Sequence, residues 1–336
     1  MDVGTHALAS LLLTRALIPR APLTAWILVP VAGTVADLDA LSASFRPSAY
    51  LDWHHTLTHS IVVSAGIGLV LGFIYLWIRR KDMAAEMSTT AFLGAVLLSG
   101  FLHLAMDVCT ADGITPFWPF SGHRIAASWL ASVDPWIIAI LIVAFLLPEL
   151  SRLVGDEIGA KAKGPRGQVG AILGLIFIMI YVGVRANFHS SALAAIQART
   201  YRGESPRRSS AYAESVSLLT WHAIVETDHA LQELTIDVTP GASFDPENGT
   251  TLFKPEPSPV LESAQNTDAA KRFLQSASFP KASIEKTPEG REVQIRDLRY
   301  AASGETQHEV VAVIRTDSNG RVIQDELRWG RDFRRR

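Results

Sequence analysis

Four long apolar runs constrain the fold of this chain more than any other feature of its sequence. They cover residues 60–78, 90–108, 131–148 and 169–187. A helix needs about 20 apolar residues to cross the ~30 Å hydrocarbon core of a bilayer, and about 17–25 residues is the usual range. Each run falls in this range, so the sequence predicts four transmembrane helices.

Two shorter apolar runs, residues 5–18 and 23–36, precede these four. Each has about 14 residues and would form a helix of only ~21 Å at 1.5 Å per residue. Short spans, tilted re-entrant segments and buried helices all fit this length. We therefore expect residues 1–187 to form an α-helical polytopic membrane domain with about four to six membrane helices.

Residues 188–336 have the mixed polar composition of an ordinary globular domain. Alternation of apolar and polar residues over 219–238 predicts one or two strands, and residues 268–277 predict a short helix. Further strands with intervening turns are predicted within 282–329, whereas residues 239–262, rich in Pro and Gly, predict a long loop. We expect a small soluble α+β domain with an antiparallel sheet.

The distribution of Lys and Arg predicts the orientation in the membrane. If the two short runs form a hairpin and the later spans alternate, the loops of one side contain nine basic residues: Arg15, Arg20, Arg79, Arg80, Lys81, Arg152, Lys161, Lys163 and Arg166. The loops of the other side contain two, Arg46 and Arg124. Basic loops stay in the cytoplasm. Residues 188–336 are therefore predicted to be extracytoplasmic.

Composition excludes some functions. The formal net charge is −2, which gives no reason to expect nucleic acid as a partner. Cys109 is the single cysteine, so an internal disulfide and a thiolate zinc site are both excluded.

The unusual ionisable residues of the membrane part all fall toward the predicted outer side. They are His6, Asp37, Asp39, His54, His55, His59, His103 and Asp107. His103 and Asp107 are four residues apart and share a helix face, and His55 and His59 have the same spacing. Ionisable groups at membrane depth are costly unless they are paired or bind a metal. Taken singly, His6 fits an interfacial histidine better, and Asp37 or Asp39 fits a helix cap equally well.

Together these residues resemble a known family. The succession of His6, "ADLD" (36–39), "HHTLTHS" (54–60) and "LHLAMDVCTADGITPFWP" (102–119) resembles the YdjM-like, LexA-regulated, membrane-bound predicted metal-dependent hydrolases. The similarity covers residues 1–125 and carries over to His6, Asp37, Asp39, His54, Thr58, His59, Ser60, His103, Asp107, Thr110, Gly113 and Pro116. Ala36, Ala40 and His55 depart from it, since the family tends to have Pro, His and Arg there.

The residues and the resemblance together imply a hydrolase of the bacterial inner membrane. One or two divalent ions, zinc first with manganese or iron as alternatives, would be held by His6, Asp37, Asp39, His54, His59, His103 and Asp107. Asp37 or Asp39 would serve as general base, and Arg124 would stabilise developing negative charge. A site at the outer interface, in contact with membrane lipids, suits a phosphoester, phospholipid or lipid-linked substrate.

Two other classes of function fit the same residues. In a proton- or metal-coupled transporter they would relay ions, although such groups are expected throughout the depth of the bilayer. In a non-catalytic envelope protein they would hold a structural metal with a closed coordination sphere.

Overall fold

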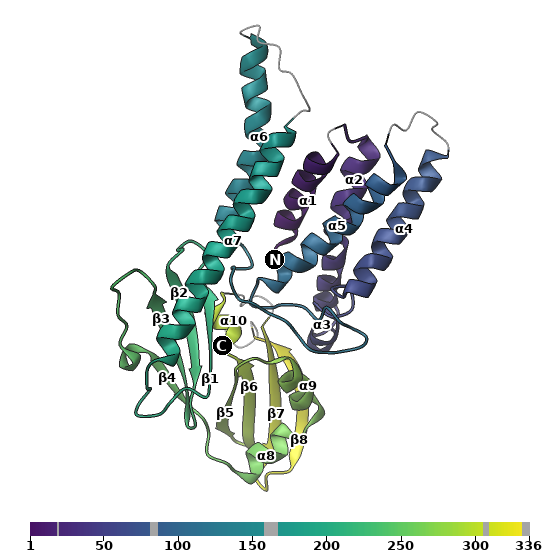
Figure 1. Ribbon diagram of the computed structural model, residues 1–336. Coiled ribbons are helices and arrows are strands. Elements are labelled where there is room, and N and C mark those ends of the chain that lie inside the picture. Colours follow the sequence, from purple (N-terminus) through teal and green to yellow (C-terminus); the bar gives the residue numbers. More distant parts are fainter. Residues whose placement is uncertain (19, 81–86, 158–166, 305–308, 331–336) are drawn as a thin grey trace. The chain divides into compact units, whose positions relative to one another are not determined.

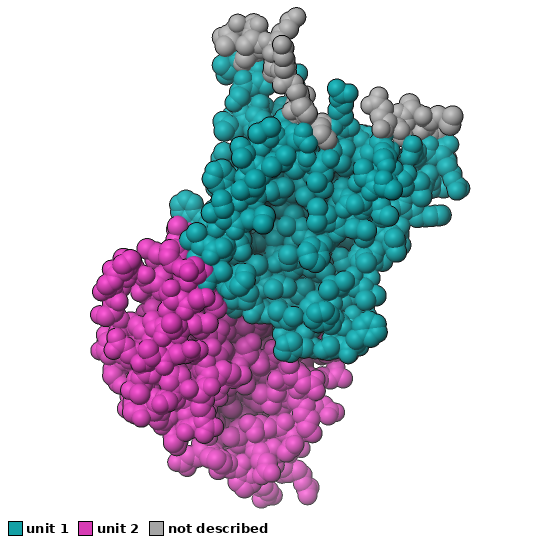
Figure 2. Space-filling view, in the orientation of Figure 1, with its two compact units in different colours: residues 1–39, 55–186 teal, residues 40–54, 187–336 magenta. Residues whose placement is uncertain are grey.

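The computed structural model describes residues 1–18, 20–80, 87–157, 167–304 and 309–330. The chain forms two compact units, coloured separately in Figure 2. The first contains residues 1–39 and 55–186, and the second contains residues 40–54 and 187–336. The C-terminal half thus forms its unit together with a short segment from the N-terminal half.

The first unit is helical (Figure 1). Its main helices are α1 (Val3–Leu17), α2 (Leu23–Ala32), α4 (Ile61–Arg79), α5 (Thr89–Val108), α6 (Pro135–Glu157) and α7 (Gln168–Gln197), of which α7 continues into the second unit. The last four are long and apolar enough to cross a membrane, with mean hydropathies between 1.8 and 2.4. The four predicted spans are confirmed as apolar helices of spanning length.

The two shorter runs form a more irregular structure. Helix α1 has 15 residues, and α2 ends at Ala32 and is followed by a 3₁₀ helix, η1 (Val35–Ser44), at an angle of 51°. Pro30 lies inside α2, and Gly33 follows its last residue, which explains why the helix is short. The described residues therefore contain four helices that could span a membrane, or up to five if α2 and η1 form one broken span.

The helices of the first unit pack through apolar side chains and leave apolar side chains exposed. Tyr75 and Phe92 stack on one another between α4 and α5, with ring centroids 4.1 Å apart. Leu69 and Phe73 on α4 remain 60% and 68% exposed, and Met179 on α7 is 74% exposed. A helix bundle with an apolar exterior as well as an apolar interior is typical of a membrane domain.

The candidate site residues lie at one end of this bundle, where α1, α4 and α6 begin and α2 and α5 end (Figure 1). Backbone hydrogen bonds fix these ends: Asp2 donates to Ser132, and Ile61 donates to Pro116. The described arginines of the predicted basic loops, Arg15, Arg20, Arg79, Arg80 and Arg152, lie at the other end. Lys81, Lys161, Lys163 and Arg166 fall outside the described residues.

The second unit contains two four-stranded antiparallel sheets where the sequence predicted one. The first has the order β1 (Arg208–Ala213), β2 (Thr220–Glu226), β3 (Ala230–Asp237) and β4 (Thr250–Phe253). The second has the order β5 (Pro280–Thr287), β6 (Gly290–Asp297), β7 (Val310–Asp317) and β8 (Val322–Trp329). The α+β class is confirmed.

Short helices complete the second unit: α3 (Pro47–Trp53), η2 (Pro246–Asn248), α8 (Pro259–Gln265), α9 (Asp268–Ser276) and α10 (Arg299–Ala302). The predicted helix within 268–277 is confirmed as α9. The prediction of a loop over 239–262 is wrong, because η2 and β4 lie inside it and α8 begins at Pro259. β4 pairs with β3 through only four residues, which is too short a pattern to recognise in the sequence.

Candidate metal centre

Four segments of the first unit bring six ionisable side chains together. They are His6 of α1, Asp37 of η1, His55 and His59 of the segment before α4, and His103 and Asp107 of α5. They form two groups whose ligand atoms all lie within 4.8 Å of one another: His6, Asp37, His103 and Asp107, and Asp37, His55, His59 and Asp107. The four histidines and Asp107 are buried, and Asp37 is nearly so.

Asp107 and Asp37 lie between the imidazole rings. Asp107 Oδ1 is 3.0 Å from His6 Nε2, and Asp107 Oδ2 is 3.1 Å from His103 Nε2 and 3.3 Å from His59 Nε2. Asp37 Oδ1 is 3.6 Å from His59 Nε2 and 3.7 Å from His103 Nε2. The Nε2 atoms of three histidines therefore converge on the same two carboxylates.

Backbone carbonyl groups orient two of the rings. His103 Nδ1 lies 3.0 Å from the carbonyl oxygen of Gly33, and His55 Nδ1 lies 2.9 Å from that of Gly113. A metal-binding histidine commonly donates one ring N–H to a carbonyl or carboxylate, which fixes the tautomer and directs the other nitrogen to the metal. Both rings are thus held with Nε2 available as a ligand atom.

A carboxylate orients the third ring. Asp39 Oδ2 lies 2.9 Å from His59 Nδ1 and also accepts hydrogen bonds from Thr58 Oγ1, at 2.6 Å, and from the backbone N–H of His55, at 3.0 Å. These interactions fix the turn that contains both histidines. Asp39 therefore positions His59 from the side opposite to Asp37 and Asp107.

The two carbonyl groups that orient imidazoles both belong to glycines without space for a side chain. A Cβ on Gly33 would lie 1.9 Å from Ser10 Oγ. A Cβ on Gly113 would lie 2.2 Å from the carbonyl oxygen of Ile125, and Gly113 has a φ of +59°. Glycine at these two positions thus lets the backbone come close enough for its carbonyl groups to reach the imidazole rings.

Several buried polar atoms of the cluster have no hydrogen-bond partner among the described residues: His6 Nδ1, Asp37 Oδ2, His103 Nε2 and Asp107 Oδ2. Buried polar atoms are nearly always hydrogen-bonded, and leaving one unsatisfied is costly. A cation coordinated by these side chains would satisfy such atoms. The imidazole and carboxylate donors, without thiolate, fit zinc and also manganese or iron.

The carboxylates also attract positive charge. Burial lowers the pKa of His59, but interactions with the carboxylates of Asp107, Asp37 and Asp39 outweigh this and raise the pKa to about 10. The α-amino group of Met1 contacts Asp107 Oδ1. A buried centre of this kind favours a divalent cation next to its carboxylates.

The structure brings together only some of the seven metal ligands proposed from the sequence. It brings His6, Asp37, His59, His103 and Asp107 into the two groups and places Asp39 behind His59. His54 belongs to the second unit, where it follows α3 and its ring stacks on Tyr50 with centroids 4.5 Å apart. Arg124 is in neither group, and its Nη1 donates to the carbonyl oxygen of Asp112 at 3.0 Å.

His55 enters the second group, although the sequence marked it only as an additional candidate. Its spacing from His59 suggested a shared helix face, but residues 54–60 form turns and bends. The two rings meet because His55 adopts the left-handed backbone conformation, with φ +57°, and their centroids are 4.4 Å apart. What pointed to His55 in the sequence was the presence of three histidines within a short segment, and not the four-residue spacing between His55 and His59.

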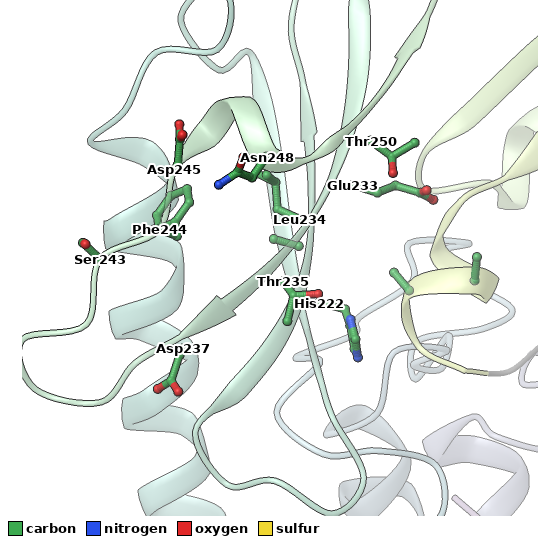
Figure 3. Close-up of a pocket in the computed structure, with 13 residues that line it drawn as sticks. His222, Glu233, Leu234, Thr235, Asp237, Ser243, Phe244, Asp245, Asn248 and Thr250 are labelled. Atoms are coloured by element: carbon green, nitrogen blue, oxygen red, sulfur yellow. The ribbon is translucent and has the colours of Figure 1, made fainter.

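An open cavity of about 580 Å³ lies in the second unit (Figure 3). Strands β2 and β3, the η2–β4 segment and α10 line it, with His222, Glu233, Asp237 and Asp245 among its side chains. Among the described residues, these side chains do not form a group of three with ligand atoms close enough for a metal. This cavity is therefore not a second candidate metal centre.

Two family models match the chain. The model of the YdjM inner membrane protein matches residues 1–192, which is more than half of the chain and includes all six residues of the two groups. The model of the YfhP C-terminal alpha/beta plait domain matches residues 259–335, from the start of α8 to beyond β8. Comparison with curated proteins and with solved structures gives no match.

Proposed function

The chain belongs to the YdjM inner membrane protein family, and from this premise we propose that it is a membrane-bound metal-dependent hydrolase. The metal, zinc first with manganese or iron as alternatives, would be held by His6, Asp37, His55, His59, His103 and Asp107.

One observation carries this proposal: four buried imidazoles and two carboxylates form two overlapping groups at the end of a membrane helix bundle, and within each group the ligand atoms lie within 4.8 Å of one another. Such groups are expensive in a membrane domain unless something compensates them. Hydrogen bonds on the outer nitrogens of His55, His59 and His103 are the pattern that surrounds metal-binding histidines.

A bound divalent metal would supply a Lewis acid and lower the pKa of water toward ~7, which gives a nucleophile at neutral pH. Asp37 is the proposed general base through Oδ2, which is free of hydrogen bonds to the described residues, while its Oδ1, which faces His59 and His103, would be the ligand atom. Asp39 is instead engaged with His59 and Thr58. Arg124 is proposed to stabilise the negative charge that develops on the substrate.

The position of the cluster favours a lipid substrate. The loop that supplies Gly113 also contains Phe117 and Phe120, which are 52% and 85% exposed. Exposed aromatic side chains next to the end of an apolar helix are typical of the headgroup layer. We propose a phosphoester in a phospholipid or a lipid-linked molecule, because its scissile group would reach the cluster at that depth.

The proposed orientation places the cluster at the outer face of the bacterial inner membrane. The described arginines at the opposite end of the bundle support this assignment through the positive-inside tendency. It follows that residues 1–187 act as the membrane domain and residues 188–336 as an extracytoplasmic domain.

The proposal is tested with protein purified in detergent and given bis(p-nitrophenyl) phosphate or phosphatidylglycerol vesicles. We expect release of nitrophenol or headgroup that EDTA abolishes, that Zn²⁺ or Mn²⁺ restores, and that His103→Ala removes. His123→Ala is a matched control, because His123 is exposed in the same unit and belongs to neither group. Hydrolysis unaffected by EDTA and by His103→Ala would contradict the proposal. Transport of Mn²⁺ into proteoliposomes without hydrolysis would favour a transporter instead.

A further inference from the structure

We propose that the cluster holds two divalent ions, and that His55 is a ligand of the second. This inference rests on the proposed metal-dependent function and specifies its centre. The first ion would be bound by His6, His103 and the two carboxylates Asp37 and Asp107. The second would be bound by His55, His59 and the same two carboxylates.

The division into two groups supports two ions. A tetrahedral site uses four ligands, and each group supplies four, whereas the cluster supplies six. Among the described residues, no group of mutually close ligand atoms contains both His6 and His55. One ion bound next to His6 would therefore leave His55 outside its coordination sphere.

The ring contacts follow the same division. The rings of His6 and His103 have centroids 4.0 Å apart, and those of His55 and His59 have centroids 4.4 Å apart. The rings of His59 and His103, one from each pair, have centroids farther apart, at 4.9 Å. Two imidazole pairs thus face one pair of carboxylates from two sides.

The two carboxylates are placed to be shared. Asp37 Oδ1 is almost equidistant from His59 and His103, at 3.6 and 3.7 Å, and these histidines belong to different groups. Asp107 Oδ2 likewise lies between histidines of the two groups, 3.1 Å from His103 and 3.3 Å from His59. Carboxylates between two sets of imidazoles are suited to bridge metals, which lie about 3.5–4 Å apart in two-metal hydrolytic sites.

The structure around His55 favours a ligand over an ordinary buried histidine. His55 has a positive φ, which is a strained conformation for a residue other than glycine. Strained residues are more frequent at functional sites than elsewhere. His55 is 4% exposed, and Gly113 O fixes its Nδ1 as the carbonyl of Gly33 fixes that of His103.

A second ion also fits the substrate class. With one divalent ion, the three carboxylates of Asp37, Asp39 and Asp107 carry more charge than the metal, whereas with two ions the charge of the metals exceeds that of the carboxylates. Two ions held by these residues would attract an anionic phosphoester and supply the positive charge that a phosphoester displacement needs. The inference therefore narrows the proposed substrate to a phosphoester.

The experiment loads detergent-purified, full-length protein with Mn²⁺ and measures bound manganese by mass spectrometry and its electron paramagnetic resonance spectrum. For the wild type we expect two ions per chain and an exchange-coupled spectrum. For His55→Arg and His55→Ala we expect one ion with an isolated six-line spectrum, and for His6→Ala the same. His123→Ala should match the wild type. The wild-type spectrum tests the proposal without depending on how well a variant folds.

The outcomes separate this inference from the proposed function. One uncoupled ion in the wild type, unchanged in His55→Arg, would overturn the second position and leave a metal-dependent hydrolase with one ion. Two ions in both His55 variants would exclude His55 as a ligand. No bound manganese in the wild type, with zinc and iron also absent, would remove the proposed function itself.

Discussion

At the residue scale, the centre depends on two glycines whose carbonyl groups hold imidazoles. We predict that Gly33→Ala weakens metal binding by about 10- to 100-fold, because the new Cβ would meet Ser10 Oγ at 1.9 Å and displace the carbonyl that orients His103. Gly94→Ala is the control, since Gly94 lies in α5 with His103 and a Cβ there has nothing within 4 Å. Titration with zinc and a competing chelator measures the affinity. Equal affinities for the two variants would show that Gly33 has no role in positioning.

Asp39 provides a second prediction at this scale. Asp39→Asn removes the charge that holds His59 Nδ1 but keeps the shape of the side chain, so we expect metal affinity to fall by about 10- to 100-fold without loss of fold. Thr58→Val removes one hydrogen bond to the same carboxylate and should have a smaller effect. Calorimetric titration compares the three proteins. An affinity for Asp39→Asn equal to that of the wild type would contradict a positioning role for Asp39.

Most of the candidate site was predicted from the sequence, but of two adjacent histidines the prediction named His54 as a ligand and His55 only as an additional candidate, whereas the structure places His55 in the second group. His6, Asp37, His59, His103 and Asp107 follow from residue type and from their common end of the bundle. Whether His54 or His55 joins them depends on where α3 ends and on the positive φ of His55. Neither property can be read from the sequence, because a turn has no periodic pattern of apolar and polar residues.

At the element scale, the helices and strands that can be predicted are those with a long run of apolar residues or a long alternation of apolar and polar residues. The runs that became α4, α5, α6 and α7 are fixed by the thickness of a bilayer, so a residue count was sufficient. β4 covers only Thr250–Phe253 in a stretch of turn residues and is defined by its pairing with β3. Whether a segment pairs with another strand depends on the folded structure, and the sequence of a four-residue segment does not reveal it.

The contact between α6 and α7 leads to a prediction at the same scale. Gly170 and Gly174 lie four residues apart on α7, where a Cβ would lie 2.6 Å from Pro148 Cγ and 2.4 Å from Ala144 Cβ of α6. Small residues at this spacing let membrane helices approach closely. Gly174→Val should therefore lower the free energy of unfolding by about 1–3 kcal/mol. Gly183→Val, where a Cβ has nothing within 4 Å, should have little effect.

Thermal or denaturant unfolding in detergent distinguishes these two variants. Equal stability of Gly174→Val and Gly183→Val would contradict the close packing of α6 on α7.

At the scale of the whole molecule, the orientation in the membrane decides which compartment supplies the substrate. A reporter fused after residue 336 should be active only outside the cytoplasm, because the basic loops are expected to stay inside. Alkaline phosphatase, which needs the periplasm, and a fluorescent protein that matures in the cytoplasm give opposite signals. Phosphatase activity without fluorescence is the predicted result. The reverse would place the cluster at the cytoplasmic face and the substrate in the inner leaflet.

The metal content of the purified protein tests the central claim most directly. Mass spectrometry on protein purified in detergent without chelators should find a divalent transition metal in stoichiometric amount in the wild type. The amount of metal per chain should fall in His103→Ala and Asp107→Ala, whose side chains lie 3.1 Å apart in the cluster, and should stay at the wild-type value in His123→Ala. Metal at background level in the wild type, or equal metal in all four proteins, would contradict the assignment of this cluster as a metal centre.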